Sequence, residues 1–298
     1  MEFRKLNKLQ QILLKMKSSE AYKNYKFLSA LQPVSTDCIR TDISSKSDAY
    51  FRHSGNAGDI IYSLPAIITL AEGRNIHLYL NINQPRTGKM YHPLGNVMLN
   101  EQMVAMLQPL LLQQPYIQSC EIYRDQPIDF DMDIFRQYPF NYRMHSIARW
   151  YFLAFGINAD LGKPWLQAPP DHRFKDSIVI ARSHRYQAPG KDYSFLRRYP
   201  KTVFVGLQNE YEEIRNMIPT IEYHPVKDFL ELAAVITGSR FFIGNQSFPF
   251  SLAEALKCKR LLEVYHISPN VIVEGANGFD FCYQPQFEKL VAKLYEGL

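Results

Sequence analysis

A glycine-containing turn that leads into an acidic helix start is the clearest candidate for chemistry in this sequence. The turn runs from His53 through Gly55, Asn56 and Gly58 to Asp59. The two glycines allow a tight turn or a close approach of the backbone to a ligand. The free N–H groups and the dipole of the expected helix favour a charged group at its start. Such a turn either binds an anion or holds a carboxylate ready as a base.

The acid itself helps to choose between these two uses. The turn does not read Gly-x-Gly-x-x-Gly, and no acid ends the next strand in the position that would contact a ribose, so a dinucleotide site is disfavoured. Asp59 would also repel a bound pyrophosphate. We interpret Asp59 as a candidate general base that takes a proton from an attacking hydroxyl. An ordinary N-cap aspartate remains the alternative.

A second turn, which follows Gly244, suits an anion better. Asn245, Gln246 and Ser247 form this turn, and Pro249 lies in the first turn of the helix that follows. Free N–H groups at the helix start, together with the Ser247 hydroxyl, could bind a diphosphate. The turn contains no acid. The alternative is a plain connection between a strand and a helix.

Three cations and one acid could complete that site. Arg182 and Arg185 follow the first strand of the second half, and Lys191 comes shortly after them. Guanidinium groups there could clamp phosphate oxygens, whereas ordinary surface charge is the alternative. Glu254, in the helix after the second turn, could hydrogen-bond a ribose or could be a solvated helix residue.

The elements that must position these residues alternate between strand and helix. The apolar patterns predict strands at 49–53, 76–82, 117–123, 177–182, 202–207, 221–224, 240–244 and 260–265. They predict helices at 59–72, 100–113, 144–155, 192–198, 209–218, 227–238, 248–257 and 285–296. Residues 124–143 carry no assignable pattern.

This alternation predicts an α/β protein with parallel sheets and right-handed βαβ units. A proline-rich stretch at 157–176 is typical of a joint between domains. We therefore expect two Rossmann-like domains, at residues 49–165 and 166–298, whose sheets face an interdomain cleft. Residues 1–48 form an N-terminal helical arm and a linker in this scheme.

The arm carries most of the net charge. Residues 1–48 contain nine Lys and Arg against five Asp and Glu, which leaves about +1 of the total of +5 for the rest of the chain. A helix is expected at 3–17, with Leu6, Leu9, Leu13 and Met16 on one face. The arm could attract phosphates or an anionic surface, and a solvated amphipathic helix is the simpler alternative.

The composition excludes several protein classes. Hydrophobic residues make up 46% and charged residues 21%, as in a soluble globular protein. No apolar run approaches the roughly 20 residues that span a bilayer, and the N-terminus does not read as a signal peptide. We expect a cytoplasmic protein with no stable membrane insertion. No metal site or disulfide is expected from four scattered cysteines, Cys38, Cys120, Cys258 and Cys282.

The two turns together resemble a known family, the ADP-heptose:lipopolysaccharide heptosyltransferases. Residues 58–65, Gly-Asp-Ile-Ile-Tyr-Ser-Leu-Pro, resemble that family's signature Gly-Asp-hydrophobic-x-x-x-Leu-Pro. Residues 243–256 resemble its second signature, Gly-Asn-Asp-Ser/Thr-Gly-Pro-x-His-Leu-Ala-x-Ala-Leu. The two signatures occur in the family's order, and the resemblance covers about residues 49–296.

The resemblance implies a GT-B glycosyltransferase that binds a nucleotide sugar on its C-terminal domain and the acceptor on its N-terminal domain. Asp59 takes the position of the family's catalytic base. The turn at His53, Gly55, Asn56 and Gly58 would then lie on the acceptor side. The implied reaction is inverting and metal-independent, without a cofactor, and the helix dipole, hydroxyl and cations stabilise the leaving diphosphate.

The chain also departs from the family pattern. Gln246, Phe248 and Phe250 stand where the family has Asp, Gly and His, so the donor need not be ADP-heptose. Lys191 could serve as the family's phosphate-binding lysine, with Arg182 and Arg185 as competing candidates. The acceptor could be a glycan or a hydroxymethylated base in DNA. A nucleotide-sugar epimerase or hydrolase and a non-catalytic sugar-binding module are the other readings, and the oligomeric state is not predicted.

Overall fold

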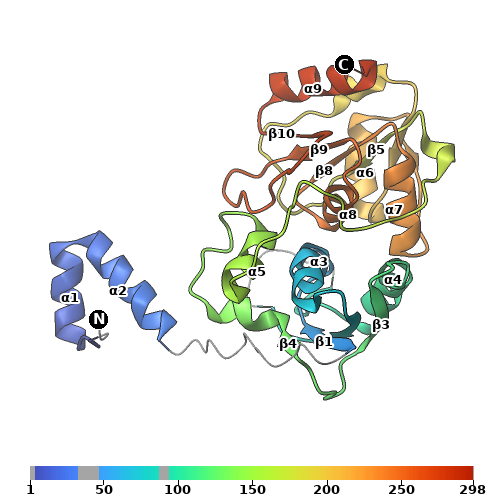
Figure 1. Ribbon diagram of the computed structural model, residues 1–298. Coiled ribbons are helices and arrows are strands. Elements are labelled where there is room, and N and C mark those ends of the chain that lie inside the picture. Colours follow the sequence, from blue (N-terminus) through green and yellow to red (C-terminus); the bar gives the residue numbers. More distant parts are fainter. Residues whose placement is uncertain (1–3, 33–46, 87–93, 298) are drawn as a thin grey trace.

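Two parallel β-sheets, each accompanied by helices, make up the body of the chain, and a pair of helices precedes them (Figure 1). The computed structural model describes residues 4–32, 47–86 and 94–297. The fold class expected from the sequence, α/β with two parallel sheets and an N-terminal helical arm, is confirmed.

The first sheet has the strand order β3-β2-β1-β4, and every pairing in it is parallel. Its central strand β1 alternates buried and half-buried residues, and Phe51 pairs with Leu78 of β2 and Phe130 of β4. The elements of this half are β1 Asp48–His53, α3 Ala57–Ala71, β2 Asn75–Leu80, α4 Glu101–Leu112, β3 Ile117–Ile122, β4 Phe130–Asp131, the 3₁₀ helix η1 Met132–Gln137 and α5 Ile147–Phe155.

The second sheet has the order β10-β9-β8-β5-β6-β7 and is also parallel throughout. Strands β5, β8 and β9 are buried along their whole length, as expected for strands covered on both faces. Its elements are η2 His172–Phe174, β5 Ile178–Ala181, η3 Ser194–Arg198, β6 Thr202–Phe204, α6 Gln208–Met217, β7 Glu222–Tyr223, α7 Phe229–Gly238, β8 Phe241–Asn245, α8 Phe248–Leu256, β9 Arg260–Glu263, β10 Gly278–Phe281 and α9 Gln284–Glu296.

The two halves share one hydrophobic core. Helix α3 of the first half packs against α8 of the second, and buried side chains of both halves belong to the same cluster. The connecting segment adds to this contact, because the indole N–H of Trp165 donates to the Ile61 carbonyl at 3.0 Å and the Trp165 backbone N–H donates to the Ala255 carbonyl at 3.0 Å. The domain limits at 165 and 166 stay a prediction.

The arm is a helical hairpin and not one helix. Helix α1, Lys8–Lys17, starts later than residue 3 because Asn7 caps it, with its side chain accepting from the Gln10 N–H at 2.9 Å. Helix α2, Ser19–Leu31, was not anticipated, and neither were the short strands β4 and β10. In the described part of the chain, no helix is long and apolar enough to cross a membrane.

Candidate active site

The turn between β1 and α3 is packed around a buried histidine. His53 is fully buried, and its Nδ1 accepts from the Gly55 N–H at 2.8 Å while its Nε2 lies 2.8 Å from the Tyr151 hydroxyl. Burial lowers the pKa of His53 to about 4, so the ring is neutral at pH 7. His53 therefore serves as an internal support for the turn, and its side chain is not accessible to a substrate.

Gly55 is required at its position by close packing. A Cβ there would lie 2.5 Å from Cε1 of His53, 2.7 Å from a guanidinium nitrogen of Arg136 and 2.9 Å from Cβ of Asp59. Gly58 is different, because a Cβ there would meet its nearest atoms, in Ser251 and Phe248 of α8, at 3.8 and 3.9 Å. The absence of a side chain at Gly55 lets His53, Arg136 and Asp59 pack closely together. Gly58 instead faces α8 in the other half of the molecule.

The carboxylate of Asp59 is held through one of its two oxygens. Oδ2 accepts from the backbone N–H and the side-chain amide of Asn56, both at 3.1 Å, and from Arg136 at 3.4 Å. No residue in the described part of the chain donates to Oδ1. The Asp59 side chain is 22% exposed. The N-cap residue of α3 is Asn56, so Asp59 is not the N-cap aspartate of the simpler interpretation. Asp59 is the third residue of the helix, where its Oδ2 accepts from the N-cap N–H, and its other oxygen is available to a ligand.

Arg136 and Asp133 belong to the site, although neither was among the residues expected there. Both lie in η1, where Arg136 pairs with Asp133 and with Asp59, and Asp133 accepts from the Ser54 N–H at 3.2 Å. Burial alone would lower the pKa of Arg136, but the nearby acids raise it overall, so the guanidinium stays charged. Both residues fall in the segment 124–143, which has no assignable pattern but is rich in aspartates and contains three arginines.

The second turn, between β8 and α8, organises the loops beside it. The Asn245 side chain donates to the carbonyls of Ser183 and Arg185 at 2.8 and 2.5 Å and accepts from the Ser183 N–H at 3.1 Å. Gln246 donates to the Ser268 carbonyl at 2.6 Å. Both side chains are buried. Asn245 and Gln246 therefore hold neighbouring loops in place, and their side chains are not free to bind phosphate.

Gln246 also links this turn to the first half of the molecule. Its side-chain amide donates to Asn270 at 2.9 Å, and Asn270 donates to the Tyr142 carbonyl at 2.9 Å. The hydroxyl of Tyr142 in turn donates to the Phe135 carbonyl in η1 at 2.6 Å. A chain of hydrogen bonds thus connects the β8–α8 turn to the segment that carries Arg136.

The start of α8 offers fewer donors than the sequence suggested. Pro249 has no N–H, and the N–H groups of Phe250 and Ser251 both donate to the Ser247 carbonyl. Among the described residues, the Phe248 N–H has no acceptor, and the Ser247 hydroxyl donates to the Asn245 carbonyl at 3.4 Å. An anion at α8 would therefore need cations from other loops.

Two residues that were expected to contact the ligand, Arg182 and Glu254, are buried and paired with other charged side chains. Arg182 is 5% exposed and forms a two-point ion pair with buried Glu263, at 2.7 and 3.0 Å, and a third contact with Glu213 at 3.2 Å. Glu254 is 1% exposed and pairs with Lys257 and with Arg260. These partners argue against direct contact of Arg182 with phosphate or of Glu254 with a ribose.

The remaining cations lie on the loop after β5. Arg185 is half-buried above the Tyr186 ring, and its buried Nε makes no hydrogen bond to any residue that the structure describes. Lys191 is also half-buried. Burial and then the like charge of Arg185 lower the pKa of Arg86, which belongs to the loop after β2. Cations from both halves of the molecule therefore approach one another here.

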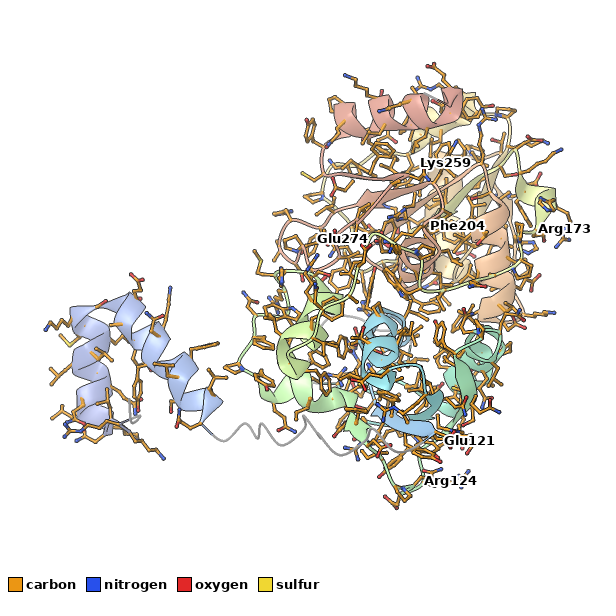
Figure 2. All side chains as sticks on the ribbon, viewed as in Figure 1. Glu121, Arg124, Arg173, Phe204, Lys259 and Glu274 are labelled. Atoms are coloured by element: carbon orange, nitrogen blue, oxygen red, sulfur yellow. The ribbon has the colours of Figure 1, made fainter. Side chains whose placement is uncertain are left out.

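Neither a metal-binding cluster nor either of two surface cavities marks this site among the described residues. The described residues contain no group of three or more His, Cys, Asp or Glu side chains that could hold a metal ion. Two surface cavities of about 290 and 320 Å³ lie elsewhere, one against Arg74 and the other against Phe279. Glu274, which lies on the loop after β9 and is labelled in Figure 2, forms an ion pair of 3.2 Å with Arg149 of α5.

The chain matches no protein-family model and no curated protein sequence. Among solved structures it is similar to E. coli heptosyltransferase WaaC with ADP, with a TM-score of 0.55 and 8% identity over 83% of this chain and 99% of that one. A family 9 glycosyltransferase of Veillonella parvula gives a TM-score of 0.51 and 11% identity, over 82% and 88% of the two chains. E. coli ADP-heptose LPS heptosyltransferase II gives 0.50 and 14%, over 84% and 99%. At these identities the likeness establishes a shared fold, the GT-B arrangement of two α/β halves.

Proposed function

We propose that this protein is a glycosyltransferase that moves a sugar from a nucleoside diphosphate sugar to a hydroxyl acceptor. The geometry of Asp59 supports this proposal most directly. Its carboxylate sits at the start of α3, is fixed through Oδ2 by Asn56 and Arg136, and keeps Oδ1 without a partner among the described residues. A fixed carboxylate with one available oxygen suits proton removal from a hydroxyl.

In the proposed reaction the acceptor hydroxyl donates its proton to Oδ1 of Asp59. The acceptor oxygen bonds to the anomeric carbon while the bond from that carbon to the diphosphate breaks on the opposite face, so the configuration inverts. Arg136 holds the carboxylate in position and balances its charge before the proton arrives. The buried, neutral His53 supports the same turn through Gly55.

The leaving diphosphate would meet the start of α8 and the loop after β5. We assign its contacts to Arg185, Lys191, the Ser247 hydroxyl and the Phe248 N–H. Charged and N–H donors of this kind can stabilise a leaving diphosphate without a metal ion. Asn245 and Gln246 position the loops that carry these groups, and Arg182 and Glu254 stabilise the strands beneath them.

The two parts of the site lie on facing helices. The bare α-carbon of Gly58 on α3 packs beside Phe248 and Ser251 at the start of α8. The base and the diphosphate donors are therefore supplied by adjoining helix ends, as transfer between two domains requires. We propose a glycan hydroxyl or a hydroxymethylated base in DNA as the acceptor.

Replacement of the base tests the proposal. The Asp59→Asn enzyme should bind nucleoside diphosphates as the wild type does, in a thermal-shift panel of nucleoside diphosphates and their sugars. Its turnover with the donor found in that panel should fall at least ~100-fold. Asp176→Asn, a change of an exposed carboxylate, should leave turnover unchanged. Wild-type turnover in Asp59→Asn would contradict the proposed mechanism. Sugar release in the absence of an acceptor would indicate a hydrolase instead.

A further inference from the structure

The N-terminal arm, residues 4–32, exposes an apolar face that packs against nothing else in the described structure. Helices α1 and α2 pack on each other and contain no buried residue, and in Figure 1 they stand apart from the two sheets. The most exposed apolar side chains of α1 follow one another at the spacing i, i+3, i+4, i+7 that defines a single helix face. They are Leu9 at 66%, Ile12 and Leu13 at 56%, and Met16 at 81% exposed, and we call them the α1 stripe.

The hairpin itself is closed by contacts outside the α1 stripe. The Leu6 N–H, just before α1, donates to the Tyr25 hydroxyl of α2 at 2.9 Å. The ammonium of Lys15 lies 5.9 Å from the centre of the Tyr22 ring. The α1 stripe is therefore not the face that folds the hairpin, and its exposure is not relieved by α2.

Positive charge borders the stripe on both sides. At 100° per residue, Lys8 and Lys15 fall on one flank of the stripe and Lys17 falls on the other. Residues 4–32 contain seven Lys and Arg and one acid, Glu20, a net charge of +6. An apolar helix face flanked by lysines is typical of helices that lie in the interface of an anionic membrane.

We propose that the arm binds the surface of a lipid bilayer that carries anionic headgroups. Helix α1 lies along the surface, with its stripe toward the acyl chains and its flanking lysines at the phosphates. Phosphates of a nucleic acid would use the lysines but leave the stripe in water. A second copy of the chain would bring two arms of charge +6 together. An anionic lipid surface matches both the apolar α1 stripe and its flanking lysines. This inference does not depend on the proposed function.

Vesicle flotation with the full chain tests this surface. Wild-type protein should float with vesicles that contain about 30% phosphatidylglycerol and should stay unbound with pure phosphatidylcholine. Leu9→Gln/Leu13→Gln and Lys8→Gln/Lys15→Gln/Lys17→Gln should each lower the partition coefficient at least ~10-fold. The matched controls change exposed residues of the body, Leu112→Gln/Leu153→Gln and Lys163→Gln/Lys175→Gln/Lys201→Gln, and should bind as the wild type does.

Two measurements made in parallel separate the other occupants. A labelled DNA duplex whose binding depends on the arm lysines, with vesicle binding unaffected by Leu9→Gln/Leu13→Gln, would assign the arm to nucleic acid and overturn the proposal. A dimer in light scattering that the leucine variant dissociates, with vesicle binding unchanged, would assign the stripe to a second copy and also overturn it. Asp59→Asn should bind vesicles normally, so that loss of transfer and loss of lipid binding are distinguishable.

Discussion

A guanidinium nitrogen of Arg136 lies 3.4 Å from Oδ2 of Asp59, although 77 residues separate the two along the chain. Asp59 lies in the first turn of α3, whereas Arg136 lies in η1 directly after the two-residue strand β4. The contact exists because β4 pairs with β1 and delivers η1 to the end of the sheet where α3 starts. The candidate base and its cation therefore come from two connections of one sheet.

Loss of this cation should slow transfer without weakening donor binding. Arg136→Gln removes the charge that fixes Asp59, and we expect turnover to fall about 10- to 100-fold with the donor dissociation constant unchanged. Arg136→Lys keeps the charge and should recover part of the rate. Steady-state kinetics and calorimetric donor titration measure the two quantities. Arg149→Gln is the matched control, and full turnover in a folded Arg136→Gln enzyme would contradict the prediction.

The two glycines of the first turn should respond differently to the same substitution. Gly55→Ala places a methyl group 2.5 Å from the His53 ring and should lower the free energy of unfolding by about 1–3 kcal/mol. Gly58→Ala meets its nearest atoms at 3.8 Å and replaces a glycine in the first turn of a helix, so stability should hold or rise slightly. Urea unfolding of both variants provides the comparison, and equal destabilisation would show that the predicted clash is relieved.

His53 should make the fold less stable in mild acid. Its pKa is about 4 in the folded protein because of burial, against 6.5 as the ordinary value. Between these values the unfolded chain binds a proton that the folded protein does not, so stability falls as the pH drops from 6.5 toward 4. The full loss is roughly 3 kcal/mol.

Urea unfolding at a series of pH values measures this effect. His53→Gln should flatten the dependence across that range, while His172→Gln, a change of an exposed histidine, should retain it. A nuclear magnetic resonance titration provides a check that needs no variant. A His53 ring that titrates near 6.5 in the folded protein would refute the assignment of a buried, neutral imidazole.

The two arginines after β5 should separate stability from ligand binding. Arg182→Gln removes the cation that pairs with the buried carboxylate of Glu263 and should lower the free energy of unfolding by about 3–5 kcal/mol. Arg185→Gln should leave stability nearly unchanged but weaken nucleoside diphosphate binding about 10-fold or more, the loss of a charged hydrogen bond. Calorimetry and urea unfolding test both variants. A stable Arg182→Gln protein that has lost nucleotide binding would reverse the two roles.

Much of the fold is encoded locally and was predicted from the sequence. The expected strands and helices of both halves are present, with ends shifted by a few residues, because each carries an apolar pattern and its own boundary residues. Strand β4 was not predicted because it is too short to show an apolar pattern: only Phe130 and Asp131 pair with β1. Helix α2 begins at Ser19, directly after the end of α1, in a stretch that gave no clear apolar pattern.

The candidate site was predicted less completely than the fold. Asp59 was identified because a Gly-containing turn and a helix start are local features. Arg182 and Glu254 were expected to contact the ligand, but both side chains are buried. Their burial could not be predicted because it depends on tertiary packing, which their sequence neighbours do not show. The partner of Arg182, Glu263, lies 81 residues away on a strand two places across the sheet.

The sequence by itself determined most of the strands and helices of the body, that the chain has two α/β halves, and that an acid stands in the first turn of α3. These features depend on contacts between near neighbours along the chain. Only the tertiary structure decided which charges are available for chemistry. Strand pairing brought Arg136 to Asp59 and buried Arg182 against Glu263, and a buried charge must be paired or hydrogen-bonded to remain ionised.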